Sequence, residues 1–295
     1  MQDLHNWLES AIKPVPRSQT VEVGGAEVHF LRWPGPDRPA QPRPGVLFVH
    51  GHAANAHWWD WTAPALLDRF DVVALDLSGN GDSDHRDVYT SHLYSEEMLA
   101  VAAAAGLQRP ILVGHSFGGT LARLACHLHP AAFRALLLVD SALPAHRSRR
   151  PPPPLPRSRV RHYESLDAAV QRFRLRPPQP APDPAILRHV ADHSVLREPD
   201  GYRFKLDPGI FARMTAEPDY PDAHSMLAAM TIPCGLVYGA RSRFFPPETV
   251  EAVQHLFAPD RLRGVANAHH HLFLDEPRLS ITTIRDVLIS LLEDD

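Results

Sequence analysis

Short apolar runs alternate with helical patterns along most of the chain. Four of the runs hold three to five consecutive aliphatic or aromatic residues, which is typical of strands buried on both faces of a parallel sheet. They lie at residues 46–49, 72–75, 111–113 and 135–139. Because helical patterns separate these runs, the chain is predicted to form βαβ units around a mostly parallel sheet.

Further elements are expected before and after these units. Alternating residues on either side of Gly24-Gly25 predict a β-hairpin. Helices are expected at residues 3–12 and 95–105, and a third, with Trp58, Trp59 and Trp61 near its start, is expected to run to about Arg69. The tryptophans are open to two interpretations, core packing and substrate binding. The remaining strand and helix patterns lie at 235–238, 247–257, 261–265 and 277–292.

Residues 142–230 differ in character from the rest of the chain. They hold half of its prolines, and six arginines without an acidic residue lie at positions 147–161. Helices are still predicted at 165–174, 184–193 and 222–230, and a bare linker of this length is improbable inside one domain. We therefore predict an inserted, mainly helical cap at 142–230, on a core of residues 1–141 and 231–295. The arginine run is either a solvated surface strand or a funnel for anionic substrates.

Composition excludes several classes of protein. The 295 residues are 44% hydrophobic and 22% charged, and the net charge of −4 favours neither nucleic acid nor a membrane as partner. No apolar run approaches the ~18 residues of a membrane span, and the first ten residues lack a signal-peptide core. The protein is therefore expected in the cytoplasm. Cys126 and Cys234 suit neither a disulfide framework nor a metal site, and both are expected to be buried apolar residues.

The strongest chemical motif is Gly114-His115-Ser116-Phe117-Gly118. An apolar strand pattern precedes it, and an Ala/Leu-rich helical pattern follows. In that context Gly-x-Ser-x-Gly forms a strained corner that projects the serine hydroxyl from the sheet. The two glycines leave no Cβ to clash there, and the start of the helix lies beneath any developing oxyanion. Ser116 is therefore predicted to be a nucleophile.

Other candidate residues also follow the predicted strands directly. The whole set is His50, His52, Asp76, Ser116 and Asp140. The carboxyl ends of parallel strands meet at one edge of a sheet, where active sites of α/β proteins form. Acyl transfer from a serine further needs a base, an acid that orients it, and N–H donors for the oxyanion. His269, His270 and His271, in a loop near the C-terminus, are the three choices for the base.

These motifs resemble those of the α/β-hydrolase superfamily, in its serine esterase and lipase-like branch. The resemblance covers nearly all of the chain outside the cap. It is carried by His50-Gly51-His52, by Asp76-x-x-Gly79-x-Gly81-x-Ser83, by residues 114–118 and by residues 270–277. It implies an eight-stranded, mostly parallel sheet flanked by helices, with the cap inserted.

The resemblance also selects the base and the acid. In this family the catalytic histidine usually stands seven residues before the proline of the final helix, which implies His270. The usual acid after the seventh strand is missing, since residues 239–243 carry no carboxylate and Glu248 is the first to follow. Haloalkane dehalogenases and certain lactonases take their acid from the end of the sixth strand, which implies Asp140. Glu248 stays the alternative acid, and a helix cap or hinge is the other interpretation of Asp140.

The same resemblance gives roles to the remaining residues. The oxyanion donors are expected to be the backbone N–H groups of His52 and Phe117. His50 resembles the structural histidine beneath the oxyanion loop, and Asp76 is expected to organise a turn rather than to act in catalysis.

The predicted activity is hydrolysis of carboxylic esters through an acyl-enzyme. A serine nucleophile argues against dehalogenase and epoxide hydrolase chemistry, which needs an aspartate there in relatives. Lactone, thioester and C–C bond hydrolysis remain alternatives, and a non-catalytic receptor or scaffold on the same fold is an alternative of another class. The predicted substrates are small to medium and largely apolar, and the cap offers Phe173, Tyr202, Phe204 and Phe211 as a pocket roof. No cofactor or metal is implied, and a monomer or homodimer is expected.

Overall fold

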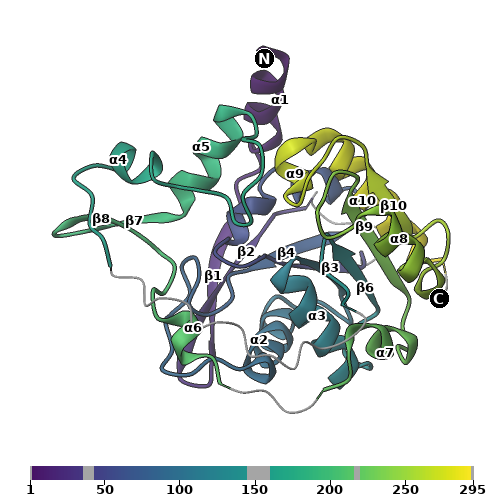
Figure 1. Cartoon of the computed structure of the whole chain (residues 1–295). Helices are drawn as coiled ribbons and strands as arrows, with labels where there is room; N and C mark the ends of the chain where they lie inside the picture. The colour runs from purple at the N-terminus through teal and green to yellow at the C-terminus, as the bar shows by residue number, and fades with distance from the viewer. Residues whose placement is uncertain (1, 36–42, 145–159, 216–219, 294–295) are drawn as a thin grey trace.

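The computed structural model describes residues 2–35, 43–144, 160–215 and 220–293. At its centre lies one sheet of eight strands (Figure 1). They are β1 (Arg17–Val23), β2 (Ala26–Arg32), β3 (Gly45–Val49), β4 (Asp71–Leu75), β5 (Ile111–His115), β6 (Ala135–Val139), β9 (Cys234–Gly239) and β10 (Leu262–Val265). Their order is β1-β2-β4-β3-β5-β6-β9-β10. β2 is antiparallel to both of its neighbours, and all pairs from β4 to β10 are parallel. The predicted eight-stranded, mostly parallel sheet is confirmed.

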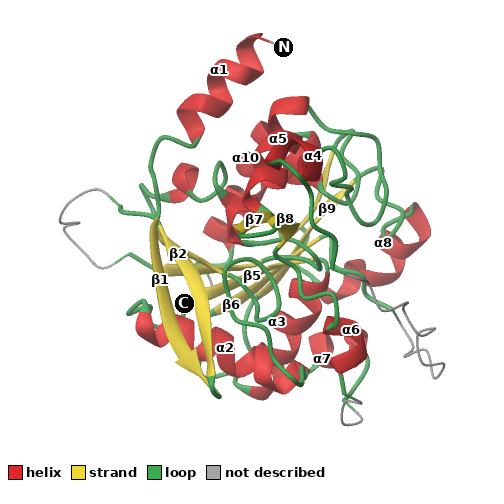
Figure 2. Cartoon of the chain, turned by 90° about the vertical axis from the view of Figure 1, so that its left-hand side faces the viewer, coloured by secondary structure: helices red, strands yellow, loops and turns green. Residues whose placement is uncertain are grey.

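Helices cover both faces of the sheet (Figure 2). One face carries α2 (Ser91–Ala104), α3 (Phe117–Leu128) and α8 (Pro247–Val253), and the other carries α1 (Gln2–Ala11) and α10 (Pro277–Ser290). Successive strand residues point to opposite faces, so Leu47 and Val49 pack into one hydrophobic cluster and Phe48 into the other. Because both clusters exclude solvent, the central strands are continuous apolar runs in the sequence.

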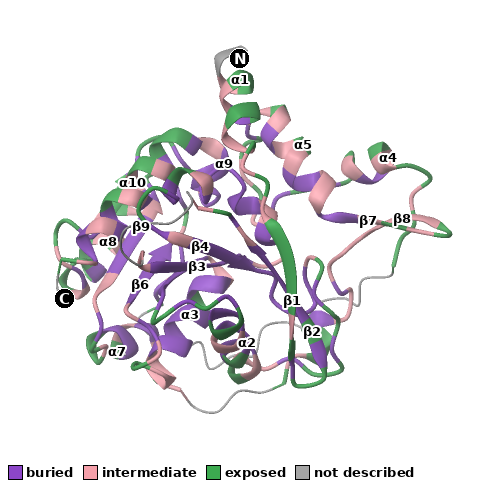
Figure 3. Ribbon diagram, turned by 180° about the vertical axis from the view of Figure 1, so that it is seen from behind, coloured by how far each residue is buried: buried purple, intermediate pink, exposed green. Residues whose placement is uncertain are grey.

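The first strand of the sheet is an exposed edge. β1 begins with Arg17, Ser18 and Gln19, and its outer residues are exposed, whereas β3 and β6 are buried along their whole length (Figure 3). Its polar sequence leaves this edge with charged and hydroxyl side chains, which disfavours pairing with another chain. β1 can therefore form the edge of the sheet without another element packed over it.

The tryptophan-rich segment after β3 does not form the predicted helix. It folds into two short 3₁₀ helices, η1 (Ala56–Trp59) and η2 (Pro64–Leu66). Trp58, Trp59 and Trp61 are all buried there, and side chains at adjacent positions cannot share one face of an α-helix. The ring of Trp59 stacks on Phe48 at 4.4 Å between centroids. Core packing is thus the correct interpretation of these residues.

The segment predicted as a cap combines helices with a β-hairpin. Its helices are α4 (Leu166–Val170), α5 (Pro184–His193), α6 (Ile210–Arg213) and α7 (Ala223–Ala228), and its unpredicted hairpin is β7 (Val195–Glu198) with β8 (Gly201–Phe204). α5 matches its predicted bounds because Asp183 caps it and Pro184 opens it. α7 packs against α3, away from α4, α5 and the hairpin (Figure 1). The bounds 142–230 of a separate cap stay a prediction, and most of the arginine run and its four consecutive prolines lie outside the described residues.

The other predicted elements are present with shifted ends. The hairpin of β1 and β2 turns at Gly24-Gly25, where both glycines have positive φ. α2 begins four residues before its predicted start, at Ser91, because the hydroxyl of Thr90 accepts the N–H of Leu93 as a cap. α8 ends early and passes into the 3₁₀ helix η3 (Gln254–Leu256), and a four-residue helix, α9 (Leu272–Asp275), precedes α10.

Candidate active site

Ser116 lies at the corner between β5 and α3. Its backbone has φ 53° and ψ −120°, a conformation that costs free energy for a residue with a Cβ. A Cβ on Gly118 would stand 2.2 Å from the carbonyl oxygen of His50, and one on Gly114 would stand 2.5 Å from the Cα of Gly119. Both glycines of the motif are therefore required by close backbone approach, and the corner presents a half-buried Ser116 above the sheet.

Ser116, His270 and Asp140 form one chain of hydrogen bonds. The Nε2 atom of His270 lies 2.9 Å from the Oγ of Ser116, and its Nδ1 lies 2.7 Å from Oδ1 of Asp140. His270 is 3% exposed and Asp140 is fully buried. Since an ionised carboxylate only accepts, Nδ1 carries the imidazole proton and Nε2 can accept the serine proton. The three residues come from the β5–α3 corner, the end of β6 and the loop before α9.

The carboxylate of Asp140 has two further donors. The N–H of Gly239 donates to Oδ2 at 2.8 Å, and the hydroxyl of Ser242 donates to Oδ1 at 2.7 Å. Glu248, the alternative acid, is exposed in the first turn of α8, whereas the two ring nitrogens of His270 are engaged by Asp140 and Ser116. Ser242 was not foreseen from the sequence. The only signal was that its turn, residues 239–243, carries no acid of its own.

The three consecutive histidines have separate environments. His269 binds Asp275 through its backbone N–H, at 2.7 Å, and through its ring. His271 is buried edge-on to Trp58, and burial, with His270 close by, lowers its pKa to about 3. Only His270 reaches Ser116.

His115, inside the serine motif, supports the loop that carries His270. Its Nε2 lies 3.1 Å from the carbonyl oxygen of His270, to which it can donate a hydrogen bond. Burial, and then the neighbouring His270, hold the pKa of His115 well below its ordinary value, so the ring is neutral at pH 7. No local sequence pattern indicates this contact.

The loop after β3 lies against the serine corner. The N–H of Leu77 donates to Nε2 of His50 at 3.0 Å, so Nδ1 of His50 carries the proton and donates to the carbonyl of Gly51 at 2.7 Å. These two bonds use both ring nitrogens of His50 and fasten the loop to the turn after β4. His50 thus lies where the resemblance implied a structural histidine.

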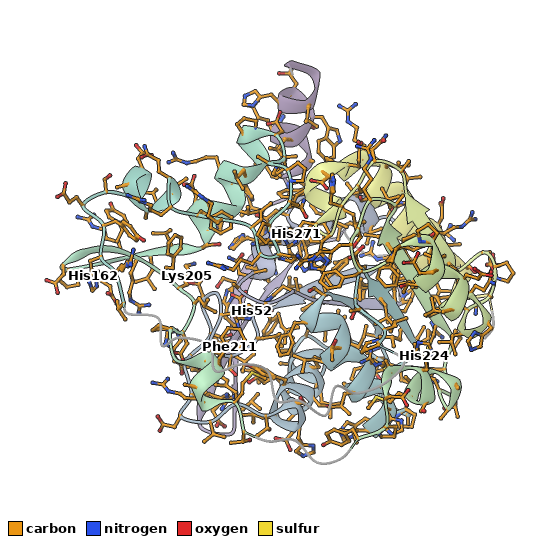
Figure 4. The ribbon with its side chains drawn as sticks, viewed as in Figure 1. His52, His162, Lys205, Phe211, His224 and His271 are labelled. Carbon is orange, nitrogen blue, oxygen red and sulfur yellow. The ribbon has the colours of Figure 1, made fainter. Side chains whose placement is uncertain are left out.

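His52 and Phe117 lie near each other beside this corner. Their rings are 6.4 Å apart, and within the described part of the chain no acceptor binds the backbone N–H of either residue. Burial is the main cause that lowers the pKa of the His52 ring to about 4, so the ring is neutral at pH 7. The ring of His52 also contacts that of Phe211, at 4.4 Å between centroids (Figure 4).

Comparison with known proteins agrees with this architecture. Residues 44–180 match the family model described as alpha/beta hydrolase fold. The solved structure of the esterase Rv0045c from Mycobacterium tuberculosis superposes with a TM-score of 0.67 at 26% identity, over 97% of this chain and 96% of that one. A thioesterase domain from the curacin biosynthetic pathway superposes with a TM-score of 0.70 at 22% identity, over 92% of this chain and 99% of that one. The chain has the α/β-hydrolase fold.

Sequence similarity to curated relatives is partial. The esterase Rv0045c is 33% identical over 138 residues, which span 45% of this chain and 43% of that protein. A pimeloyl-[acyl-carrier protein] methyl ester esterase of Neisseria meningitidis is 26% identical over 259 residues, spanning 84% of this chain and 78% of that protein. An uncharacterised M. tuberculosis protein is 33% identical, but the chain spans only 31% of its length. Among the described residues, no helix is both long and apolar enough to cross a bilayer.

Asp76 organises the turn after β4 in this α/β-hydrolase fold. Oδ1 accepts the N–H of Ala56 at 2.6 Å, and Oδ2 accepts the N–H of Asp82 at 2.9 Å and lies 2.8 Å from Nδ1 of His29. Burial alone would raise the pKa of Asp76, but the hydrogen bonds and the charge of nearby histidines lower it to about 2. The predicted turn role agrees with these contacts, none of which involves Ser116 or His270.

Apolar side chains surround the hydrogen-bonded chain. Phe244 lies 4.8 Å from the ring of His270, while Phe117 and Phe211 flank His52. Of the aromatic residues expected in a roof, Phe211 reaches the site, but Phe173 and Phe204 pack on each other, and Phe173 packs on Trp58. Aromatic rings therefore lie beside both His270 and His52.

Proposed function

We propose that this protein is a serine hydrolase that cleaves carboxylic esters through an acyl-enzyme. The observation that carries the proposal is the hydrogen-bonded chain from Ser116 through His270 to Asp140, with the serine on a strained corner. Such a chain lets a neutral imidazole accept the serine proton while a buried carboxylate stabilises the imidazolium that forms.

The reaction has two steps, acylation of Ser116 and hydrolysis of the acyl-enzyme. The Oγ of Ser116 attacks the ester carbonyl carbon as His270 takes its proton, and the tetrahedral oxyanion is bound by the N–H groups of His52 and Phe117. The bond to the alcohol oxygen then breaks, and His270 returns the proton to the leaving alcohol. In the second step His270 deprotonates water, which attacks the acyl carbon, and Ser116 leaves as a hydroxyl. No metal or organic cofactor takes part.

The surroundings support apolar acyl or alcohol groups. Phe117, Phe211 and Phe244 offer aromatic faces near the reacting atoms, and both His52 and His115 are neutral at pH 7. The named esterases that this chain resembles are consistent with ester cleavage. Thioesters and lactones react by the same steps and belong in the same screen.

The test is hydrolysis of p-nitrophenyl esters from acetate to palmitate. Wild type is expected to turn over, and Ser116→Ala and Asp140→Asn are expected to lower kcat by on the order of 10³- to 10⁴-fold. Glu248→Gln, which changes the exposed alternative acid, serves as the matched control and should keep wild-type activity. Loss of activity in Glu248→Gln with full activity in Asp140→Asn would overturn the assignment of the acid. A wild type inert on esters, thioesters and lactones alike would overturn the proposal.

A further inference from the structure

Three histidines surround one buried carboxylate where α5 packs on η1. None of these four residues forms a hydrogen bond with Ser116. Asp60 ends η1, and its Oδ2 lies 3.0 Å from Nδ1 of His57, 2.7 Å from Nε2 of His189 and 4.0 Å from Nε2 of His193. The side chain of Asp60 is 8% exposed. Its Oδ1 is buried and has no hydrogen-bond partner among the described residues.

The spacing of these residues on their elements suits a shared ligand. His189 and His193 are four residues apart on α5, so both rings project from the same face of that helix. His57 lies in η1 and Asp60 caps its end, so one short element supplies the other two groups. Metal sites are frequently built from two ligating side chains on each of two elements.

The two elements are also fixed to each other. The side chain of Asn55, which caps η1, donates to the hydroxyl of Ser194 at 3.1 Å, and Ser194 follows α5 directly. The rings of His57 and His193 stack at 3.7 Å between centroids, across the seam between the two elements. The hydrogen bond between Asn55 and Ser194 therefore holds the two elements together independently of the four donor side chains.

The donor set has the chemistry of a transition-metal site. One donor atom each of His57, Asp60 and His193 lies within 4.8 Å of the others, and Nε2 of His189 is closer still to the carboxylate. Zn²⁺ takes imidazole nitrogen and carboxylate oxygen at about 2.0–2.2 Å in tetrahedral geometry, whereas Mg²⁺ and Ca²⁺ prefer oxygen alone. Three imidazoles and a single carboxylate thus favour Zn²⁺ or a similar ion.

We propose that His57, Asp60, His189 and His193 form a binding site for one divalent transition-metal ion of the Zn²⁺ type, which ties α5 to η1. Binding replaces the hydrogen bonds from His57 and His189 to Asp60 by metal bonds. Each imidazole then carries its proton on the nitrogen that does not bind the ion. The ring of His193, whose Nε2 now lies 4.0 Å from Oδ2 of Asp60, moves closer to reach the ion. The proposal does not depend on esterase activity, because none of the four residues contacts Ser116, His270 or Asp140.

The test uses an untagged chain stripped with EDTA and then titrated with ZnCl₂ by calorimetry, with MgCl₂ in parallel. We expect one Zn²⁺ per chain at a Kd of about 1 μM or below, a Zn²⁺-dependent rise in Tm, and no response to Mg²⁺. Absence of stoichiometric Zn²⁺ binding at about 100 μM metal would overturn the proposal.

Variants locate the ion. Asp60→Asn keeps the shape of the carboxylate without its charge. His193→Gln changes the most exposed of the three rings. If one variant fails to fold, the other still tests the site. Each is expected to weaken Zn²⁺ binding by at least about 10-fold, the loss typical of removing even an outer partner of a metal ligand, and to abolish the rise in Tm. His162→Gln is the matched control, because His162 is paired with Glu198 of β7 and makes no ion pair with Asp60 (Figure 4 labels His162).

A further variant distinguishes this site from the other buried histidines. His115, His270 and His271 also bring ring nitrogens together, so His271→Gln is measured beside the others. The proposal expects His271→Gln to bind Zn²⁺ as wild type does. Undiminished binding in both Asp60→Asn and His193→Gln, or loss of binding in His271→Gln alone, would place the ion elsewhere and overturn it.

Discussion

Three donors converge on the carboxylate of Asp140, two from the end of β9 and the turn after it and one from the loop before α9. His270 binds one oxygen, the N–H of Gly239 binds the other, and the hydroxyl of Ser242 shares the oxygen used by His270. A carboxylate held in this way has one orientation. Because it accepts a hydrogen bond from the imidazole of His270, it also fixes the plane of that ring. Ser242 is thus a positioning residue for the proposed reaction, because it acts on His270 through the carboxylate of Asp140.

Ser242→Ala should lower kcat by about 10-fold and leave KM nearly unchanged. The change removes one hydrogen bond to a charged group, a loss of about 1.5–3 kcal/mol, part of which is recovered when Asp140 relaxes toward Gly239. Steady-state kinetics on the best p-nitrophenyl ester measure both constants. Ser242→Thr keeps a hydroxyl and should retain most of the activity. Equal losses in the Ala and Thr variants would show that packing, not the hydrogen bond, is what Ser242 supplies.

Residue identities in the site could be predicted where a motif, or a place at a strand end, carries them. Ser116 stands in a motif with its own strand and helix, and the geometry around it agrees with the sequence interpretation. Ser242 and His115 act through contacts to residues 102 and 155 positions away, respectively. Neither has a local pattern that separates it from an ordinary serine or core histidine, so single-sequence reasoning could not find them.

At the scale of elements, the corner between β5 and α3 is built against the loop that follows β3. Gly118→Ala would place a Cβ 2.2 Å from the His50 carbonyl oxygen and 2.6 Å from that of Val49, both of them backbone atoms. The strand end, the helix or the oxyanion loop must then shift. We expect a loss of about 3 kcal/mol in the free energy of unfolding and the loss of most ester hydrolysis, since overpacking of this kind is costly.

Gly106→Ala provides the comparison for that prediction. Gly106 follows α2 with φ +70°, and an added Cβ there meets nothing within 4 Å. It should therefore cost only about 1–2 kcal/mol, from backbone strain, and leave activity intact. Urea unfolding and ester hydrolysis of both variants decide the matter. Equal losses of stability with intact activity in Gly118→Ala would show that close approach at the corner is unimportant.

Elements whose pattern is amphipathic or continuously apolar were predictable, and those shaped by tertiary contacts were not. The strands, α5 and α10 follow from periodicity and capping residues. The helix expected to run to about Arg69 did not form because Trp58, Trp59 and Trp61 all pack into one hydrophobic cluster, whereas adjacent residues of a regular α-helix do not share one face. The hairpin of β7 and β8 was missed because its strands have only four residues each and no clear alternation.

At the scale of the whole molecule, Asp76 joins segments that are distant in sequence. It receives hydrogen bonds from His29 in β2, from Ala56 in η1 and from Asp82 in its own turn. The turn that Asp76 organises also holds His50, through the N–H of Leu77. His50 in turn holds the loop beside Ser116. The stability of the sheet edge and the shape of the site therefore depend on one ionised carboxylate.

That dependence predicts how stability changes with pH. The pKa of Asp76 is about 2 in the folded protein, against 3.8 ordinarily, so folding favours the ionised form. A depressed folded pKa stabilises the protein above pH 3.8, and this contribution is lost as the pH falls toward 2. The difference of almost two pH units corresponds to about 2 kcal/mol.

The measurement is the free energy of unfolding in urea from pH 6 to pH 2.5, for wild type and Asp76→Asn. The asparagine cannot ionise, so the gap between the two proteins should be largest at pH 6 and shrink by most of that ~2 kcal/mol at the acid end. Glu251→Gln, at an exposed position of α8, should show a gap near zero at every pH. If the gap for Asp76→Asn stayed constant with pH, the ionised carboxylate would not be what holds the turn, and its shape alone would explain the contacts.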